Sequence, residues 1–218
     1  MNVSHKFPLF FVPLCLLYLL ISSSLAAELS AVVKILPILL LAFLVVRTGL
    51  PSGTVSKATS IYLLIALFFS MGGDVLLEVG HFVPGLVSFL TAQIAYAVLF
   101  TKNYSNWNKN LPVSVAIIVF ALGMSWLMWG SAGEMRIPVL GYLTVISFMG
   151  LTAASSSIKG VTLGALTFMA SDSLIAINRF VTEVPASGPV VMISYYLAQY
   201  LLIVSVLNSK ELNSENDA

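Results

Sequence analysis

The sequence contains few charged residues, and this scarcity indicates where the protein resides. Only 9% of its 218 residues are charged, 59% are hydrophobic, and the mean hydropathy is +1.00. About a quarter of the residues are charged in soluble domains, so the composition excludes an ordinary soluble protein. We therefore expect an integral membrane protein with little chain left for a soluble domain.

Several residue patterns that mark other protein classes are also missing. The single cysteine, Cys15, cannot form an internal disulfide. The two histidines, His5 and His81, lie far apart and lack the spacing of metal ligands, so we expect no metal and no cofactor. The absence of G-x-S-x-G, P-loop and G-x-G-x-x-G motifs argues against a serine hydrolase and a nucleotide-binding protein. No nucleic-acid partner is expected.

Apolar runs occupy most of the chain, and each is long enough to cross a bilayer, which takes about 20 helical residues. Eight such runs cover residues 7–26, 30–49, 58–79, 82–101, 111–130, 136–155, 160–180 and 188–207. They show no two-residue alternation of polarity, which favours helices over a β-barrel. The sequence predicts an all-α integral membrane protein, a bundle of eight transmembrane helices forming one domain over residues 1–210, with a polar tail over 211–218.

The first run has a second interpretation. Lys6, the apolar stretch and the small residues at 22–27 also resemble a signal peptide, and its cleavage would leave seven helices. Basic residues predict the orientation, because positive charge favours the cytoplasmic side. One side of the bundle carries Lys6, Arg47, Lys57, Lys102, Lys109, Lys159 and Lys210, and the other carries Lys34, Arg136 and Arg179. Both termini are therefore predicted to be cytoplasmic, and the short connections suggest a bacterial inner (plasma) membrane.

Two aspartates lie inside apolar runs. Asp74 is in LFFSMGGDVLLEVG (67–80) and Asp172 is in FMASDSLIA (168–176). An ionised aspartate near the centre of a membrane helix costs about 2.5–3.5 kcal/mol, so both are candidates for function, with a structural link to Lys or Tyr as the alternative. Both sites read small-small-Asp-x-Leu, and a phenylalanine follows eight residues later in each (Phe82, Phe180). This similarity suggests a parallel four-plus-four duplication.

With this orientation, both aspartates lie at mid-depth or in the half of the bundle away from the cytoplasm. Other polar residues are predicted to gather in the same half. Pairs three or four residues apart share a helix face, as Gln93 does with Tyr96 and Tyr195 with Gln199. We expect a polar pocket to which the following residues contribute: Lys34, Gln93, Tyr96, Tyr142, Tyr195 and Gln199. Arg179 is a further candidate, although it could instead pair with Glu183 four residues later.

Two carboxyl groups can hydrolyse an acid-labile bond, since one donates a proton while the other stabilises an oxocarbenium ion and directs water to it. A vinyl ether fits, because protonation of its carbon generates such a cation. The apolar neighbours of Asp74 and the nearby Glu78 favour Asp74 as the acid. The hydroxyl groups of Ser171 and Ser173 favour Asp172 as the carboxylate.

Several segments resemble the YhhN family of membrane lysoplasmalogenases. They are Lys34 with Pro37 at the head of the second helix, FFSMGGDVLL (68–77), FVPGLVSFL (82–90) leading to Tyr96, Gly141-Tyr142, GALTFMASDSLIAINRF (164–180) and YYLAQYLL (195–202). The resemblance implies an eight-helix bundle that hydrolyses lysoplasmenyl-ethanolamine or -choline to a fatty aldehyde and a glycerophospho-head group. It also implies that Asp74 and Asp172 are the catalytic pair. One departure is Gln93, where the family leads us to expect histidine.

The expected partners are a lysophospholipid substrate, water and the bilayer, with a homo-oligomer as an open alternative. Lys34 and Arg179 are expected to receive the lipid phosphate, and Tyr142, Tyr195 and Gln199 to position water and the carboxylates. Two other functions stay open at this point. A small-molecule or proton-coupled transporter would use the same acids to bind protons and substrate, and a non-catalytic lipid-binding protein would use them structurally.

Overall fold

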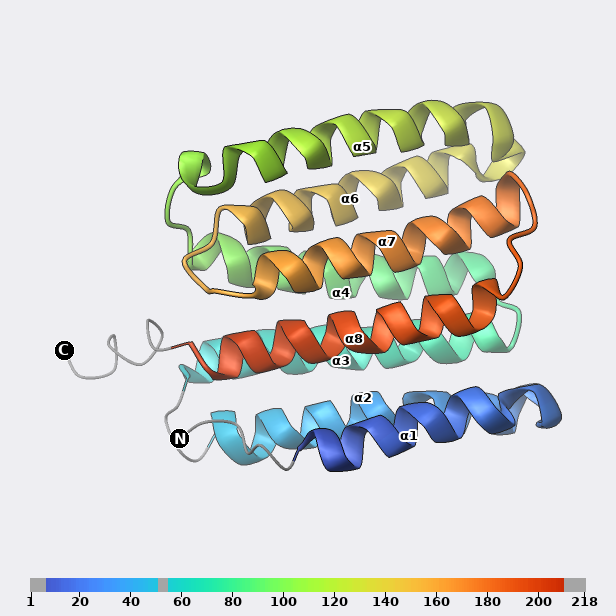
Figure 1. The fold of residues 1–218 in the computed structure, drawn as a ribbon, viewed down its shortest axis with the longest axis horizontal. Coiled ribbons are helices and arrows are strands. Elements are labelled where there is room, and N and C mark those ends of the chain that lie inside the picture. Colours follow the sequence, from blue (N-terminus) through green and yellow to red (C-terminus); the bar gives the residue numbers. More distant parts are fainter. Residues whose placement is uncertain (1–6, 51–54, 210–218) are drawn as a thin grey trace.

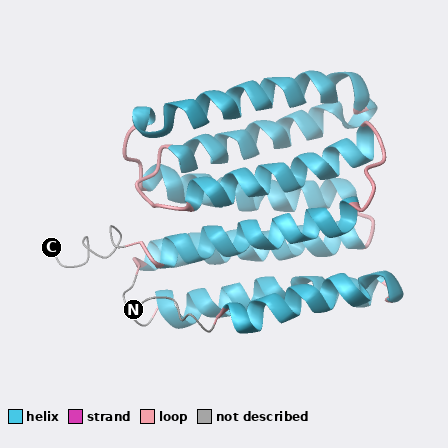
Figure 2. Ribbon diagram, viewed as in Figure 1, coloured by secondary structure: helices cyan, strands magenta, loops and turns pink. Residues whose placement is uncertain are grey.

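The structure is a computed structural model that describes residues 7–50 and 55–209, so the predicted polar tail at 211–218 lies outside the described residues. All regular elements within these two ranges are helical (Figure 2). The helices are α1 (Pro8–Ile21), α2 (Ala27–Gly49), α3 (Lys57–Glu78), α4 (Phe82–Lys102), α5 (Leu111–Ser131), α6 (Arg136–Ala154), α7 (Val161–Phe180) and α8 (Ser187–Leu207). Three short 3-10 segments, η1 (Ser22–Ser24), η2 (Trp107–Asn110) and η3 (Gly133–Met135), lie between them.

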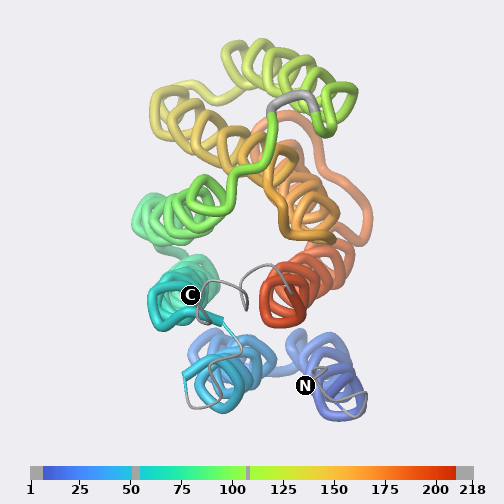
Figure 3. The backbone as a smooth tube through the Cα atoms, turned by 90° about the vertical axis from the view of Figure 1, so that its left-hand side faces the viewer, coloured from blue at the N-terminus to red at the C-terminus, as the bar shows by residue number. Residues whose placement is uncertain are grey.

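The helices run up and down side by side, and α1 begins at the end of the bundle where α8 ends (Figure 1). Viewed along the helices, α2, α3 and α4 form one row, α1, α8 and α7 form the facing row, and α5 and α6 close one side (Figure 3). Helices α3 and α7, which carry the two aspartates, therefore belong to facing rows. Below, "the cavity end" denotes the end of the bundle where α3 and α7 end and α4 and α8 begin.

The prediction of a helical membrane bundle is confirmed. Seven of the described helices are long and apolar enough to cross a membrane, and α1 with η1 is a shorter apolar helix. The bounds of the seven lie within three residues of the predicted runs. The first run is different, because its helix ends at Ile21 and three serines continue it as the tighter η1 before α2 begins.

Glycines allow α3 and α4 to approach closely beside the first aspartate. A Cβ atom on Gly73 would lie 2.4–2.8 Å from ring carbons of Phe89, and one on Gly85 would lie 2.8 Å from Leu77. No real Cβ contact is that short, so the crossing requires residues without a side chain at both positions. This close contact fixes the position of Asp74, the residue after Gly73, relative to α4.

One expectation about α2 is wrong. Lys34 and Pro37 do not stand at the head of the helix, because α2 begins at Ala27 and places Lys34 two turns inside it. Ser30, one turn before Lys34, is also on the buried face of the helix. Lys34 is consequently 8% exposed and its ammonium group needs partners within the protein.

Candidate functional site

The first aspartate lies in a cluster of charged groups at the cavity end. Asp74 and Glu78 are one turn apart on α3, and Lys34 of α2 lies against both. The Lys34 Nζ atom is 3.0 Å from Glu78 Oε2 and 3.9 Å from Asp74 Oδ1. The hydroxyl of Tyr195 donates to Asp74 Oδ2 at 2.6 Å. The buried Asp74 carboxyl is thus stabilised by one cation and one phenol.

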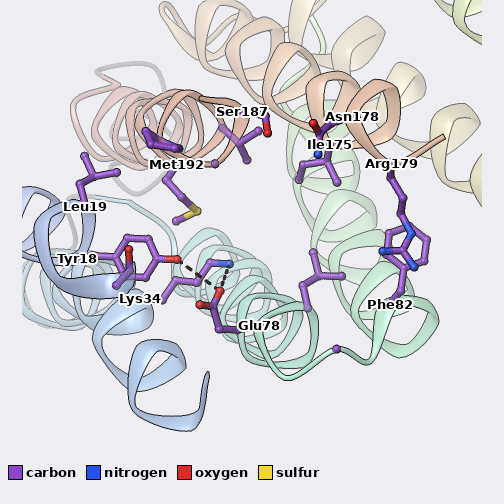
Figure 4. A pocket seen from close by; sticks show the side chains of 16 residues that line it. Tyr18, Leu19, Lys34, Glu78, Phe82, Ile175, Asn178, Arg179, Ser187 and Met192 are labelled. Atoms are coloured by element: carbon purple, nitrogen blue, oxygen red, sulfur yellow. Dashed lines mark hydrogen bonds and ion pairs between the residues drawn. The ribbon is translucent and has the colours of Figure 1, made fainter. Parts of the chain in front are cut away.

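Glu78 is held by three donors, as Figure 4 shows in part. Ser30 donates to Oε1 at 2.6 Å, and Tyr18 donates to Oε2 at 3.4 Å, the same oxygen that contacts Lys34. From the sequence, Glu78 was expected only to be a like charge near Asp74. In the structure it is the main partner of Lys34. The four-residue spacing from Asp74 places both carboxyl groups on one helix face, and this signal could have identified it.

The second aspartate has a simpler environment. Asp172 accepts a hydrogen bond from the hydroxyl of Tyr142 on α6, and no described cation lies within ion-pair distance of it. The expectation that the neighbouring serines stabilise its charge is wrong. Ser171 donates to the carbonyl of Val191 at 3.0 Å, and Ser173 donates to the carbonyl of Met169 at 2.7 Å. A helical serine readily bonds a backbone carbonyl one turn back, as Ser173 does, while Ser171 bonds across to α8, so neither hydroxyl is directed to Asp172.

Two glutamines lie deeper in the bundle and differ in their contacts. Gln199 accepts from the hydroxyl of Tyr96 at 2.6 Å and donates to Ser70 Oγ at 2.9 Å, so this network links α3, α4 and α8. Its partners are these side chains and neither aspartate. Gln93 is fully buried, and both polar atoms of its amide lack a hydrogen-bond partner among the described residues. Burying an amide without hydrogen bonds lowers the stability of the fold, and among the predicted pocket residues this applies to Gln93.

A cavity of about 380 Å³ opens at the cavity end, and its polar lining includes Lys34, Glu78, Asn178 and Arg179 (Figure 4). The Arg179 guanidinium lies 3.9 Å from the centre of the Phe82 ring. Within residues 7–50 and 55–209, no acidic group lies within ion-pair distance of the Arg179 guanidinium, so the alternative pairing with Glu183 is not formed. Arg179 is thus an exposed cation on the wall of the cavity, available to an anion.

The same cavity approaches Asp172 as well. A smaller cavity of about 50 Å³ adjoins it and is lined by Tyr142 and Asp172. The two cavities share Leu77, Phe82 and Ile175 as lining residues. The two phenylalanines of the sequence similarity, Phe82 and Phe180, meet edge to face with ring centres 5.8 Å apart.

The arrangement allows general acid–base chemistry at the edge of a cavity that an amphiphile can reach. The buried Asp74 and the partly buried Asp172 each accept a hydrogen bond from a tyrosine, and among the described residues only Asp74 is paired with a lysine. No group of three or more described His, Cys, Asp and Glu side chains is arranged to hold a metal ion.

Comparison with known proteins identifies the family of the chain. The model of the YhhN family matches residues 29–206. Lysoplasmalogenase TMEM86A of Bos taurus is 31% identical over 217 residues, covering 93% of this chain and 88% of its own length. Human lysoplasmalogenase TMEM86B is 33% identical over 187 residues, covering 83% of this chain and 76% of its own length.

A bacterial relative extends the comparison. The lysoplasmalogenase of Mycobacterium tuberculosis is 30% identical over 162 residues, which cover 69% of this chain and 62% of the relative. No solved structure matches the chain. The family match spans α2 to α8 and includes both aspartates, Lys34 and all the tyrosines that contact them from α6 and α8. The chain is a multi-pass integral membrane protein and belongs to the YhhN family.

Proposed function

We propose that the protein is a lysoplasmalogenase, which hydrolyses the vinyl ether bond of a lysoplasmalogen. The relatives that cover most of the chain carry this name. The observation that carries the proposal is a pair of carboxyl groups near the cavity end. Asp74 is buried against Lys34, which lines the polar cavity, and Asp172 lines the small cavity that adjoins it. Both a proton donor and a carboxylate are needed to cleave an acid-labile ether.

The contacts favour a division of roles opposite to the one suggested by sequence. Lys34 places a positive charge beside Asp74, which suits Asp74 to act as the carboxylate. Asp172 has a tyrosine partner and no described cation within ion-pair distance, which suits it to hold and donate a proton. We assign Asp172 as the general acid and Asp74 as the group that stabilises the cation and directs water.

The reaction balances with these two groups and one water. The Asp172 carboxyl transfers its proton to the outer vinyl carbon, and the ether oxygen shares the positive charge as an oxocarbenium ion. Water attacks the carbon bound to that oxygen and releases a proton to Asp74, which gives a hemiacetal. In the collapse of the hemiacetal, the glycerol oxygen takes the proton from Asp74 as its bond breaks and the hydroxyl proton returns to Asp172, which yields the aldehyde and the glycerophospho-head group and restores both carboxyl groups.

The remaining predicted residues take different parts in this proposal. Tyr142 and Tyr195 orient the two carboxyl groups, because each donates to one of them. Arg179 is the better candidate for the lipid phosphate, since the Lys34 ammonium is already shared by two carboxylates. Gln199 and Tyr96 hold helices together below the site. A bacterial plasma membrane and assembly as a homo-oligomer remain predictions.

Incubation of the purified protein with lysoplasmenyl-ethanolamine tests the function. Mass spectrometry should detect the fatty aldehyde and glycerophosphoethanolamine in equal amounts. In D2O the aldehyde should carry one deuterium on the carbon next to the carbonyl, because that carbon receives the proton. Absence of both products from folded protein, combined with lysolipid counterflow in proteoliposomes, would replace the enzyme with a transporter.

A further inference from the structure

A second, apolar groove of about 520 Å³ lies between α1 and α8, and the catalytic proposal does not use it. The described residues that form its walls are all uncharged. They include Phe11, Leu16 and Leu19 from α1 and Tyr196, Leu197 and Tyr200 from α8. Leu16 is 51% exposed and Leu197 is 48% exposed, so the groove faces the surroundings of the bundle. In a membrane, a surface of this kind accepts hydrocarbon.

The groove adjoins the polar cavity. Leu19 lines both spaces, and at this residue the apolar wall meets the cavity that contains Lys34 and Glu78 (Figure 4). Tyr196 lines the groove with its ring and donates its hydroxyl to the carbonyl of Lys34 at 2.8 Å. The end of a molecule lying in the groove is therefore next to the part of the cavity that Lys34 and Glu78 line.

The direction and length of the groove suit one lipid chain. On α1 it runs from Leu19, near the cavity end, to Pro8, which are eleven residues apart and so roughly 16 Å along the helix. Half of the hydrocarbon thickness of a bilayer is about 15 Å. The spaces beside Asp172 are much smaller, about 50 and 30 Å³, and cannot take a chain of that length without rearrangement.

We propose that the groove between α1 and α8 binds the single hydrocarbon chain of the lysolipid, with the phosphate at Arg179 and the scissile bond between them, in the polar cavity lined by Lys34 and Ile175. This inference rests on the proposed function for the identity of the lipid. The groove that meets the polar cavity at Leu19 has room for one chain, so we expect the site to favour lipids with one chain.

Photocrosslinking tests the inference without requiring turnover. The full-length protein in diacyl phosphatidylcholine nanodiscs is incubated with a lysoplasmenyl-ethanolamine that carries a diazirine on its chain. Crosslinks are expected on peptides of α1 and α8, and unlabelled lysoplasmalogen should remove them while added diacyl lipid should not. Labelling that diacyl lipid removes equally well, or that falls equally on the outer face of α5, would overturn the proposal.

A pair of lipid-facing substitutions provides the matched control. Leu197→Trp fills the groove, and it should lower crosslinking about tenfold and raise KM for long-chain substrate more than it lowers kcat. Leu122→Trp, on the exposed face of α5, should change neither. Equal crosslinking and equal KM in the two variants would refute the assignment of the groove as the binding site of the chain. Aldehyde release without groove labelling would overturn this inference alone, whereas groove labelling without aldehyde would overturn only the proposed function.

Discussion

Replacing Lys34 by methionine should lower the free energy of unfolding, because two carboxyl groups lose the cation that they share. The ammonium group contacts both Asp74 and Glu78, and the lysine side chain is only 10% exposed. Methionine keeps most of the length and apolar volume but removes the charge. Lys34→Met therefore leaves two carboxyl groups without their shared cation.

The size of the effect follows from what each carboxyl group retains. Breaking a buried ion pair by removing one partner costs about 3–5 kcal/mol. Glu78 retains Ser30 and Tyr18 as donors and a side chain that is 21% exposed, whereas Asp74 retains only Tyr195 and is 3% exposed. We expect a loss near the lower limit, about 3 kcal/mol, and most of it should arise at Asp74.

The measurement is the free energy of unfolding in detergent, with Lys159→Met as the control because Lys159 lies exposed outside the helices. Adding Asp74→Asn to the Lys34→Met protein should recover about 1–3 kcal/mol, since the uncompensated carboxylate is gone. The reasoning is refuted if Lys34→Met costs no more than the control, or if Asp74→Asn destabilises the Lys34→Met protein further.

Three further substitutions test particular contacts. Tyr142→Phe should lower turnover about 10- to 100-fold, because it removes the hydroxyl that orients Asp172; unchanged kcat would contradict this. Gly73→Ala should cost about 1–3 kcal/mol of stability, since its Cβ meets an aromatic ring of α4, whereas Gly123→Ala, with open space around it, should be neutral or stabilising in the same unfolding assay. Gln93→Met should stabilise by about 1 kcal/mol, because no described group bonds its buried amide; a lower melting temperature would show that the amide is bonded.

The membrane bundle could be predicted from sequence because long apolar runs have one stable arrangement in lipid. The end of α1 at Ile21 was missed, since hydropathy alone does not register the change to the 3-10 turn at Ser22–Ser24. The two aspartates stood out because charge inside an apolar run is costly.

The partners of the aspartates were harder to predict. Lys34 and Glu78 are 44 residues apart in sequence, and their ion pair depends on how α2 packs against α3. Sequence spacing gives the face of one helix but not the register between two helices. Similarly, the hydroxyls of Ser171 and Ser173 were expected to stabilise Asp172, but Ser173 donates to a carbonyl one turn back and Ser171 donates to a carbonyl of α8.

The rate of aldehyde formation in Asp172→Asn and Asp74→Asn proteins, compared with the unmodified protein, tests the central claim most directly. Each asparagine keeps the shape of the side chain but can neither donate a carboxyl proton nor carry a negative charge. Loss of positioned acid–base catalysis lowers a rate by about 10²–10⁴-fold, and we expect a decrease in this range for each variant. Near-normal aldehyde formation by either folded variant would contradict the assignment of that aspartate and, with it, the paired mechanism.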